Sequence, residues 1–528
     1  MTSDSRGSIS LFASITLLLI LIAPTPSSAQ DVLRGPYLQQ VTPTSIVVRW
    51  RTSIATTSRV VLGTTVGAST IVETVTGTRE NHEVAITGLT PATLYYYQVG
   101  TATLLLAGGD ATHAFRTAPP VGSTGPVRVW AIGDAGTGTP NQMQVRDAYY
   151  TSAGLTTTDV WLMLGDNAYD SGLDIEYQER LFDMYADLLR TTPFWATRGN
   201  HDTSSNRHYG LCTNPTAAEA GGVASGTEAY FSFDHANVHF ICLDSEGSNR
   251  SPSGSMLQWL AADLANNLSE WTIAFWHHPP YTKGSHDSDD SGDSGGRMTD
   301  MRENALPILE AGGVDLVLGG HSHCYERSFL IDGHYDVSST LDPLTMILDG
   351  GDGDPAGAGA YQKPLVSANQ GTVAIVMGSS GKQSGGPLNH PAMQTSVSLL
   401  GSLVLDIQGS TLTGQMLRED GTIEDTFQIS KGSSPVPSDF RRGDTNSIPG
   451  ITIGDSIRLL QSLFVSGSSL DCEDAGDVND DGSLDLGDPI ALLAYGFQGG
   501  PPPAPPQINC GPDLTPDSLG CAVVSGCP

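Results

Sequence analysis

The sequence predicts a multidomain protein: a β-sandwich, then an α/β domain of β-sheets flanked by helices, then a small α-helical domain with acidic loops. Three observations lead to this fold class. Short β-rich segments separated by Gly, Thr and Pro fill residues 32–118. From residue 125, apolar strands alternate with helical apolar spacing. Beyond residue 440, an acidic Gly-Asp pattern repeats every 33 residues, each time before an apolar helix.

Composition limits the classes of function. The 528 residues are 39% apolar, enough for about three domains with cores of their own. Lys and Arg total 25 against 57 Asp and Glu, which gives a net charge of −32. Such a chain repels nucleic acid and anionic membranes. We therefore expect no nucleic-acid-binding surface, and the charge favours bound cations.

The first residues have the layout of a secretory signal. Arg6 precedes an apolar run over 11–23, and small residues at 27–29 suit cleavage after Ala29. The run is short for a membrane anchor, and no other stretch is long and apolar enough to span a bilayer. We expect residues 1–29 to be a signal peptide and the mature protein to be secreted, in the extracellular space, the periplasm or at the cell surface.

The cysteines agree with export. Four of the seven lie in the last 57 residues, which indicates local disulfides in an oxidising compartment. Connectivity does not follow from the sequence, and a Cys212–Cys242 bond stays open. The odd count leaves a thiol unpaired, for which we expect Cys324, as a small buried apolar side chain.

Residues 30–120 are expected to form the β-sandwich. The segment 88–95 resembles the corner before a late strand of fibronectin type III domains, where a tyrosine hydroxyl bonds back to the backbone. The resemblance implies a fibronectin III-like domain, with Tyr95 as the corner residue. Its expected role is structural or docking.

Residues 125–430 are expected to form the α/β domain. The predicted strands are Val127–Ile132, Val160–Leu164, Phe194–Thr197, Val238–Leu243, Thr272–Trp276 and Val314–Leu318. The predicted helices, from their apolar spacing, are 175–189, 256–266 and 301–311. Later strands at 372–377, 402–405 and 411–416 predict a second sheet that completes a sandwich.

Five short motifs follow these strands: GDAG at 133–136, GDNAY at 165–169, GNHD at 199–202, HHPPY at 277–281 and GHSH at 320–323. Because the carboxyl ends of strands in an α/β sheet face one crevice, their side chains are expected to converge on a ligand. Mixed carboxylate, amide and imidazole donors suit first-row metals. Seven donors suit two ions that share one carboxylate and lie about 3.5–4 Å apart.

The order of the motifs resembles that of calcineurin-like metallophosphoesterases. The tyrosine of the second motif and the preceding β domain make residues 32–430 similar to purple acid phosphatases. The resemblance implies a binuclear centre of Fe with Fe, Zn or Mn, bridged by Asp166. It implies that the first site, ferric iron in the family, is completed by Asp134, Tyr169 and His323. It implies that the second site is completed by Asn200, His277 and His321. His277 is preferred to His278 because the family spacing is ligand His, one residue, then Pro.

The resemblance also implies roles beside the ions. His201 would bond a phosphoryl oxygen or assist the leaving group, and Asp202 would orient that imidazole, or else be a helix-capping or turn residue. In the loop after HHPPY, His286 would contact the substrate or donate a proton, unless it belongs to an acidic surface loop. Lys283 is a weaker candidate for the mouth of the same pocket.

A polar linker at 431–440 leads to a repeat domain at 441–500 and a Pro-rich, Cys-stapled tail at 501–528. The second repeat fits an EF-hand-like loop, with Gly482 at position 6. Oxygen-bearing side chains at positions 1, 3, 5, 9 and 12 are Asp477, Asn479, Asp481, Asp485 and Asp488. The pattern resembles dockerin type I repeats and implies bound calcium. In the first repeat Ile448 and Pro449 depart from the pattern, which leaves open calcium binding there and a cohesin-like or cell-surface partner.

The expected function is therefore that of a secreted binuclear-metal phosphatase. The resemblance implies hydrolysis of small phosphomonoesters through in-line attack by a hydroxide that the metals supply. A phosphodiesterase or nucleotidase with the same metal site is an alternative, because the motifs do not separate monoesters from diesters. A further alternative is a surface-assembly protein with an inactive phosphatase fold, which acts through its dockerin-like end.

Overall fold

The computed structural model describes residues 30–153, 158–204, 207–365, 368–432, 440–446, 450–465, 472–507 and 509–511, with Met1, Leu470 and Leu519. The predicted secretory signal, residues 433–439 of the predicted linker, Ile448 and Pro449, and most of the predicted tail lie outside the described residues. Among the described helices, none has the length and apolarity that crossing a membrane requires.

The N-terminal domain is a folded sheet of six strands. These are β1 Val32–Gln39, β2 Ser45–Gly63, β3 Ile71–Thr87, β4 Leu94–Gly100, β5 Leu105–Gly108 and β6 Ala114–Arg116. β1 pairs with the first half of β2, and β4 pairs with its second half. Both halves contribute to one core, for example through Ile46 and Leu62. The Tyr95 hydroxyl accepts a 3.0 Å hydrogen bond from the backbone N–H of Thr90, which confirms the predicted corner contact.

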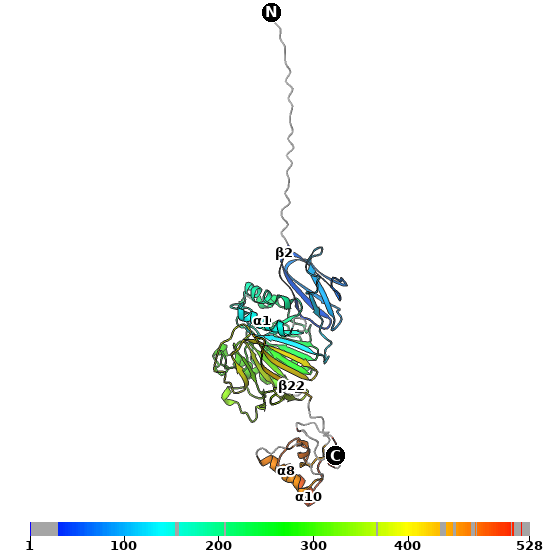
Figure 1. Ribbon diagram of the computed structural model, residues 1–528, viewed down its shortest axis with the longest axis vertical. Helices are drawn as coiled ribbons and strands as arrows, with labels where there is room; N and C mark the ends of the chain where they lie inside the picture. The colour runs from blue at the N-terminus through cyan, green and yellow to red at the C-terminus, as the bar shows by residue number, and fades with distance from the viewer. Residues whose placement is uncertain are drawn as a thin grey trace.

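The central domain is built on two seven-stranded sheets (Figure 1). One has the order β10-β11-β12-β13-β18-β14-β19 and the other β17-β22-β21-β20-β7-β8-β9. Their strands are β7 Val127–Ile132, β8 Val160–Met163, β9 Phe194–Ala196, β10 Phe231–His235, β11 Val238–Cys242, β12 Trp271–Phe275, β13 Leu316–Gly319, β14 Tyr325–Ser328, β17 Tyr361–Lys363, β18 Val373–Met377, β19 Met393–Val397, β20 Gly401–Gln408, β21 Thr411–Arg418 and β22 Ile423–Lys431. A small separate sheet pairs β15 Leu330–Ile331 with β16 Ile347–Asp349.

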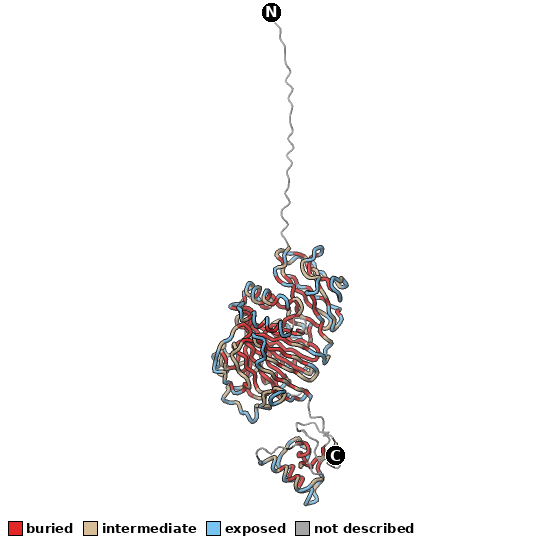
Figure 2. Tube along the Cα trace, in the orientation of Figure 1, coloured by how far each residue is buried: buried red, intermediate tan, exposed pale blue. Residues whose placement is uncertain are grey.

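The two large sheets pack face to face. Alternate residues of β7 and β12, such as Val129 and Ile273, meet in one core between them. Each outer face is covered by helices, through cores that include Met256 and Leu309 on one side and Trp130 and Tyr149 on the other. Figure 2 shows the buried residues following the strands of this sandwich. The predicted sandwich flanked by helices is confirmed.

The division of strands between the sheets differs from the prediction. The later strands do not form a second sheet of their own: β20 and β21 join β7, whereas β18 joins β13. The motif-bearing strands are therefore split, with β7, β8 and β9 in one sheet and β12 and β13 in the other. The site expected at one sheet edge thus lies where the carboxyl edges of two sheets meet.

The helices of the central domain are α1 Pro140–Ala153, α2 Asp174–Tyr177, η2 Gln178–Phe182, α3 Ala186–Leu189, α4 Arg207–Leu211, α5 Ser255–Asn266, η4 Asp293–Gly296, α6 Arg297–Asp300, η5 Met301–Ala305, α7 Leu306–Ala311 and η6 Ser338–Thr340. Two predicted helices, 175–189 and 301–311, are wrong as continuous α-helices, because the π-helical turn η2 interrupts the first and the π-helical turn η5 forms the start of the second. Their apolar residues are nevertheless buried, so the spacing predicted the buried face and not an unbroken hydrogen-bond ladder.

The N-terminal domain is bound to the central domain by buried polar contacts. Arg34, which is buried, pairs with Asp174 at 3.1 Å and donates to Gln178 at 2.7 Å. The Tyr37 hydroxyl donates to the carbonyl of Leu211 at 2.9 Å. Asp174 also pairs with Arg51 at 2.7 Å. These contacts hold the chain that follows the GDNAY motif against a rigid β domain.

The repeat domain contains α8 Ile453–Phe464, α9 Glu473–Gly476 and α10 Gly487–Gln498. A small core forms between the helices from Leu459, Val478 and Leu492. The prediction of a small helical domain is in keeping with these elements.

The described cysteines are of two kinds, disulfide-bonded in the C-terminal region and free in the central domain. Cys472 and Cys510 are disulfide-bonded, and Cys324 is free and buried as predicted. The Cys212–Cys242 bond is absent, because both thiols are free and buried. Cys242 lies in the core between the sheets and Cys212 in the core of one outer face, so the sheet separates them.

Candidate metal centre

Seven polar side chains converge where the two sheets meet. Parallel pairing aligns β7 with β8 and β9 in one sheet and β12 with β13 in the other, so their carboxyl ends lie at matching edges. The loops after β7, β8 and β9 supply Asp134, Asp166, Tyr169 and Asn200, and the loops after β12 and β13 supply His277, His321 and His323. All seven predicted ligands are therefore placed at one site.

The first group of donors consists of Asp134, Tyr169 and His323. The Tyr169 hydroxyl donates to Asp134 Oδ1 at 2.9 Å, and it lies 3.5 Å from His323 Nε2. His323 Nε2 is also 3.5 Å from Asp134 Oδ1. Asp134 is fully buried and Tyr169 nearly so, so these atoms share one enclosed space.

The second group consists of Asn200, His277 and His321. His277 Nε2 lies 3.0 Å from Asn200 Oδ1 and 3.2 Å from His321 Nδ1. Asp166 joins the two groups: its Oδ1 is 3.5 Å from His277 Nε2, and ligand atoms of Asp134, Asp166 and His277 all lie within 4.8 Å of one another. The seven side chains can therefore be grouped as the sequence resemblance implies, and their assignment to two ion sites stays a prediction.

Tight backbone turns bring these side chains together. Asp134, Asp166 and His321 have φ of 55°, 52° and 65°, the left-handed region that costs a residue with a Cβ about 1–2 kcal/mol. Gly199 allows the loops to touch, because a Cβ there would lie 2.2 Å from Asp166 Oδ1. Backbone strain at three candidate ligands is typical of a functional site.

Each candidate histidine is oriented through its other ring nitrogen. His277 Nδ1 donates to the carbonyl of Leu164 at 2.9 Å. His321 Nε2 lies 2.6 Å from Ser294 Oγ, and His323 Nδ1 lies 3.0 Å from Ser384 Oγ. Partners of this kind fix the ring and the tautomer of metal-ligating histidines. Sequence reasoning missed Ser294 and Ser384, since serines in Gly-rich loops carry no distinctive signal.

His277 and its neighbour His278 make different contacts at the site. A carbonyl oxygen only accepts, so Nδ1 of His277 carries a proton for Leu164. Its Nε2 meets the oxygens of Asn200 and Asp166. His278 instead lies 2.9 Å from Ser245 Oγ through Nδ1. A ligand atom of His278 nevertheless lies within 4.8 Å of ligand atoms of His277 and His321, so the choice of His277 stays a prediction.

The electrostatics of the site favour a cation. Burial lowers the pKa of His277, but Asp166 and Asp134 outweigh it and raise that pKa. Burial raises the pKa of Asp166, and the nearby Asp134 carboxylate raises it further. Burial and the surrounding imidazoles hold the pKa of His321 well below its usual range, so His321 is neutral, the form that binds metal. Positive charge is required among these acceptors, and the mixed oxygen and nitrogen donors fit first-row metal ions.

His201 lies at the open side of the site. Its Nδ1 donates to the carbonyl of Asp170 at 2.6 Å, which leaves Nε2 directed at the site, 3.9 Å from Asp166 Oδ2. The side chain is 35% exposed, whereas Asp166 is buried. His201 can therefore meet a ligand that enters from solvent.

Of the two roles left open for Asp202, the structure shows the contacts of a turn residue and none with the His201 ring. Its buried carboxylate accepts hydrogen bonds from the backbone N–H groups of Asn167 and Gly199, each at 3.0 Å, and from the Tyr177 hydroxyl at 2.8 Å. A fully buried carboxylate needs these donors, and no imidazole contact replaces them. Asp202 joins the GDNAY loop to the GNHD loop and positions Asp166 through the backbone.

The loop after HHPPY brings His286 to the site and turns Lys283 away. The His286 ring stacks on His321, with ring centroids 3.9 Å apart, and its Nδ1 lies 2.9 Å from Asp293 Oδ1. Lys283 pairs with Asp287 at 3.0 Å and Asp289 at 2.9 Å, so its charge is neutralised locally. The surface-loop alternative for His286 is not supported by this packing.

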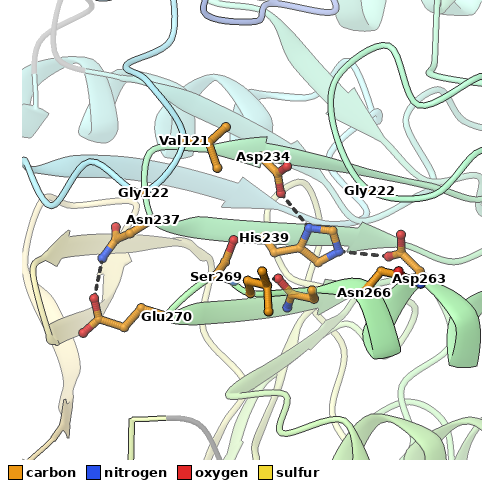
Figure 3. Close-up of a pocket in the computed structure, with 12 residues that line it drawn as sticks. Val121, Gly122, Gly222, Asp234, Asn237, His239, Asp263, Asn266, Ser269 and Glu270 are labelled. Carbon is orange, nitrogen blue, oxygen red and sulfur yellow. Dashed lines mark hydrogen bonds and ion pairs between the residues drawn. The ribbon is translucent and has the colours of Figure 1, made fainter.

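A second histidine–carboxylate cluster lies away from the candidate metal centre. In Figure 3, His239 points to Asp234 and Asp263. They lie in a pocket of about 510 Å³ lined by β10, the start of β11, the end of α5 with the loop to β12, and by Val121, Gly122 and Gly222. Its two ring nitrogens are 2.7 Å from Asp234 and 2.9 Å from Asp263. Burial lowers the pKa of His239, but these two hydrogen bonds outweigh it and raise the pKa to about 9. No sequence motif marks this cluster.

Comparison with known families agrees with the fold and the site. Residues 127–325 match the calcineurin-like phosphoesterase family, and residues 36–117 match the purple acid phosphatase N-terminal domain. The chain is thus purple acid phosphatase-like, with a calcineurin-like metallophosphoesterase domain that follows this N-terminal domain.

Individual relatives give the same result. Purple acid phosphatase 15 of Arabidopsis thaliana is 26% identical over 300 residues, which cover 51% of this chain and 53% of the relative. Purple acid phosphatase 21 of the same plant is 30% identical over 267 residues, 47% and 53% of the two chains. The chain spans about half the length of the curated relatives it matches first.

Solved structures show the fold alone. The purple acid phosphatase PPD1 from seeds of yellow lupin (Lupinus luteus) superposes with a TM-score of 0.56 at 18% identity, over 75% of this chain and 74% of the other. A structure of PhoD gives 0.52 at 14% identity, over 77% and 92%.

Proposed function

We propose that this protein is a secreted phosphatase that hydrolyses small phosphomonoesters at a binuclear metal centre. The observation that carries the proposal is the separation of seven converging donors into two groups that Asp166 joins. Asp134, Tyr169 and His323 would complete one site, which suits ferric iron, and Asn200, His277 and His321 the other, which suits Fe, Zn or Mn. When bound, such ions lower the pKa of a coordinated water and neutralise charge on the phosphoryl oxygens.

The protein's own groups would handle the substrate. His201 Nε2 faces the site from the solvent side, so it would bond a phosphoryl oxygen or give a proton to the leaving group. His286, stacked on His321 and held by Asp293, would contact the ester from the opposite loop. Asp202 would act only through the backbone, by fixing the two loops that carry Asp166 and Asn200.

Export is part of the proposal. The predicted secretory signal and the disulfide-bonded Cys472 and Cys510 support an oxidising compartment. A phosphodiesterase or nucleotidase would use the same ions, and an assembly protein with an inactive site would use none.

The test compares hydrolysis of p-nitrophenyl phosphate and bis-p-nitrophenyl phosphate by residues 30–528, from acid to alkaline pH. We expect a monoester preference, and we expect Asp166→Ala to lower kcat/KM more than about 100-fold, beyond the loss typical of residues that only orient ligands. Gly210→Ala, in α4 with nothing near its Cβ position, is the control.

Other outcomes separate the alternatives. A diester preference that Asp166→Ala abolishes would move the chain to the phosphodiesterases. Turnover that Asp166→Ala leaves intact would refute the bridging role. A wild type inactive with Fe, Zn and Mn would favour the assembly protein.

We further propose that residues 477–488 bind calcium in a dockerin-like domain. Asp477 and Asp488 are buried, and Asp477 accepts from the backbone N–H groups of Asp481 at 3.1 Å and Gly482 at 2.9 Å. Asp488 accepts from Val478 at 2.8 Å, as Asp455 accepts from Thr445 at 2.9 Å in the first repeat. This equivalence supports the repeat and a ring of oxygens around the loop.

Calcium titration of residues 30–528 tests this second proposal. Calcium at about 100 times its Kd should stabilise the repeat domain by about 2.7 kcal/mol. The Asp477→Ala variant should lose that gain, whereas Asp166→Ala should keep it. An unfolding transition that calcium does not shift in the wild type would refute calcium binding.

The same domain suits attachment to a protein partner on a cell surface or in a complex. Three apolar residues of α8 have apolar counterparts 33 residues later in the chain, and all six side chains are at least half exposed. The pairs are Ile453 and Leu486, Ile457 and Ile490, and Phe464 and Phe497. Exposed apolar patches of this kind mark interaction surfaces. Binding to cell envelopes that a Phe464→Ser, Phe497→Ser double variant retains would contradict this role.

A further inference from the structure

The loop after β18 forms a wall of the candidate metal centre. Residues 378–390, GSSGKQSGGPLNH, follow β18 directly. The backbone N–H of Gly133 donates to Ser380 Oγ at 3.3 Å, and the backbone N–H of Ser384 donates to the carbonyl of His323 at 3.0 Å. The loop is thus bonded to the GDAG and GHSH motifs at once.

Close backbone contacts fix the position of this loop. A Cβ at Gly381 would lie 2.4 Å from the carbonyl oxygen of Ala135, and a Cβ at Gly386 would lie 1.6 Å from that of Gly284. The loop therefore packs directly on the loops that carry the donors. A side chain between these two glycines is held at the site.

That side chain is Lys382. Its Nζ lies 4.4 Å from the centroid of the Tyr169 ring, and the Tyr169 hydroxyl reaches Asp134 Oδ1 at 2.9 Å. The ammonium group is therefore about one aromatic ring away from the donor cluster. The His201 ring lies against the same tyrosine, with centroids 4.5 Å apart. Lys382 and His201 therefore both contact the ring of one candidate ligand, beside the donor cluster.

Lys382 differs from the other basic side chains around the site. Lys283 pairs with Asp287, Arg297 with Glu246 at 2.9 Å and Arg198 with Asp244 at 3.5 Å. Among the described residues, no carboxylate lies within 4.0 Å of Lys382 Nζ, although the chain has a net charge of −32. A cation held beside the donor cluster without an acidic partner has its charge available for an anion that binds there.

We infer that Lys382 binds a non-bridging oxygen of the phosphate group and selects dianionic phosphomonoesters over monoanionic diesters. The inference rests on the proposed phosphatase function and adds the residue that sets its substrate class. When the two metal ions bind other oxygens of the phosphate group, a monoester still has a charged oxygen for Lys382. A diester has a second, neutral ester oxygen in that place. An ammonium group on a flexible stem can leave the tyrosine ring for the anion, since a cation–π contact at an exposed site is weak.

The test uses Lys382→Met and Lys382→Arg in metal-loaded protein at about pH 7.5, where a phosphate monoester is largely a dianion. Lys382→Met should lower kcat/KM for p-nitrophenyl phosphate about tenfold, the effect of one charge-assisted hydrogen bond. This fold-loss should be at least about five times the fold-loss in kcat/KM for the bis-ester. The Kd for inorganic phosphate, from calorimetry, should rise about tenfold. Lys382→Arg should restore most of both losses.

Arg79→Met, which removes one charge from the exposed part of β3, is the matched control and should change none of these values. Equal losses for monoester and diester, or an unchanged Kd for phosphate, would overturn the inference and leave the proposed function intact. Absence of turnover in the wild type would overturn the proposed function instead, and phosphate binding would still test Lys382.

Discussion

Two histidine–carboxylate clusters lie at opposite ends of the adjacent parallel strands β11 and β12, and they differ in the groups that they bring together. His239, at the start of β11, has both ring nitrogens within 2.9 Å of a carboxylate, so each contact joins a donor to an acceptor. His277, which follows β12, donates from Nδ1 to the carbonyl of Leu164. Its Nε2 faces the acceptor oxygens of Asn200 and Asp166.

The difference shows how a structural ion cluster is told from a candidate metal site. The His239 cluster needs only the proton that its raised pKa supplies. At the other end, two carboxylates, an amide oxygen, a tyrosine hydroxyl and three imidazoles converge, a mixed set of oxygen and nitrogen donors that suits first-row metal ions. Residue types overlap in the two places, so the number and variety of the converging donors carry the distinction.

A substitution at the candidate metal centre should have the largest effect on activity. In Gly199→Ala the new Cβ would lie 2.2 Å from Asp166 Oδ1 and would displace the carboxylate that joins the two groups. We expect phosphatase activity to fall to the level of Asp166→Ala, with metal content reduced and the circular dichroism spectrum retained. Wild-type activity in this variant would show that Asp166 does not require its observed position.

Disturbing the His239 cluster should change stability and leave chemistry alone. His239→Gln removes the positive charge between two buried carboxylates, and loss of one partner of a buried ion cluster costs about 3–5 kcal/mol. Urea unfolding at about pH 6 measures this loss. Activity per folded molecule should stay within about twofold, because the cluster touches none of the donors. A large loss of turnover would contradict the separation of the two clusters.

The pH dependence of that loss sharpens the comparison. The folded pKa of His239, about 9, lies above the ordinary 6.5, so the proton is bound more tightly in the folded state. Its contribution, about 3 kcal/mol, is complete below about pH 6.5 and is lost as pH rises through about 9. The stability difference between wild type and His239→Gln should therefore shrink over that window. A constant difference would show that His239 is not protonated in the folded protein.

Much of the metal side could be predicted from the sequence, because short motifs follow strands whose apolar runs are clear. The predicted Val127–Ile132 matches β7, and each of the five motifs lies at the end of a strand. The division into two sheets could not be predicted, since strand pairing at long range leaves no local pattern. The π-helical turns η2 and η5 could not be predicted for the same reason. The spacing of apolar residues reports which face of a helix is buried, whereas the type of helical turn depends on tertiary packing.

Contacts made by tertiary folding account for the remaining differences. Asp202 follows a ligand motif, yet its partners come from the GDNAY loop and α2, which no spacing in the GNHD motif reveals. Lys382 lies in a Gly-rich segment after a predicted strand, the same placement as the five motifs, and this signal could have drawn attention to it. The His239 cluster combines three distant residues without any motif.

Anomalous X-ray diffraction from crystals of the metal-loaded protein tests the central claim most directly. The account predicts two ions per chain, about 3.5–4 Å apart, with Asp166 between them. One ion should contact Asp134, Tyr169 and His323, and the other Asn200, His277 and His321. A single ion, or ions bound away from Asp166 while these seven side chains stay free, would contradict the account.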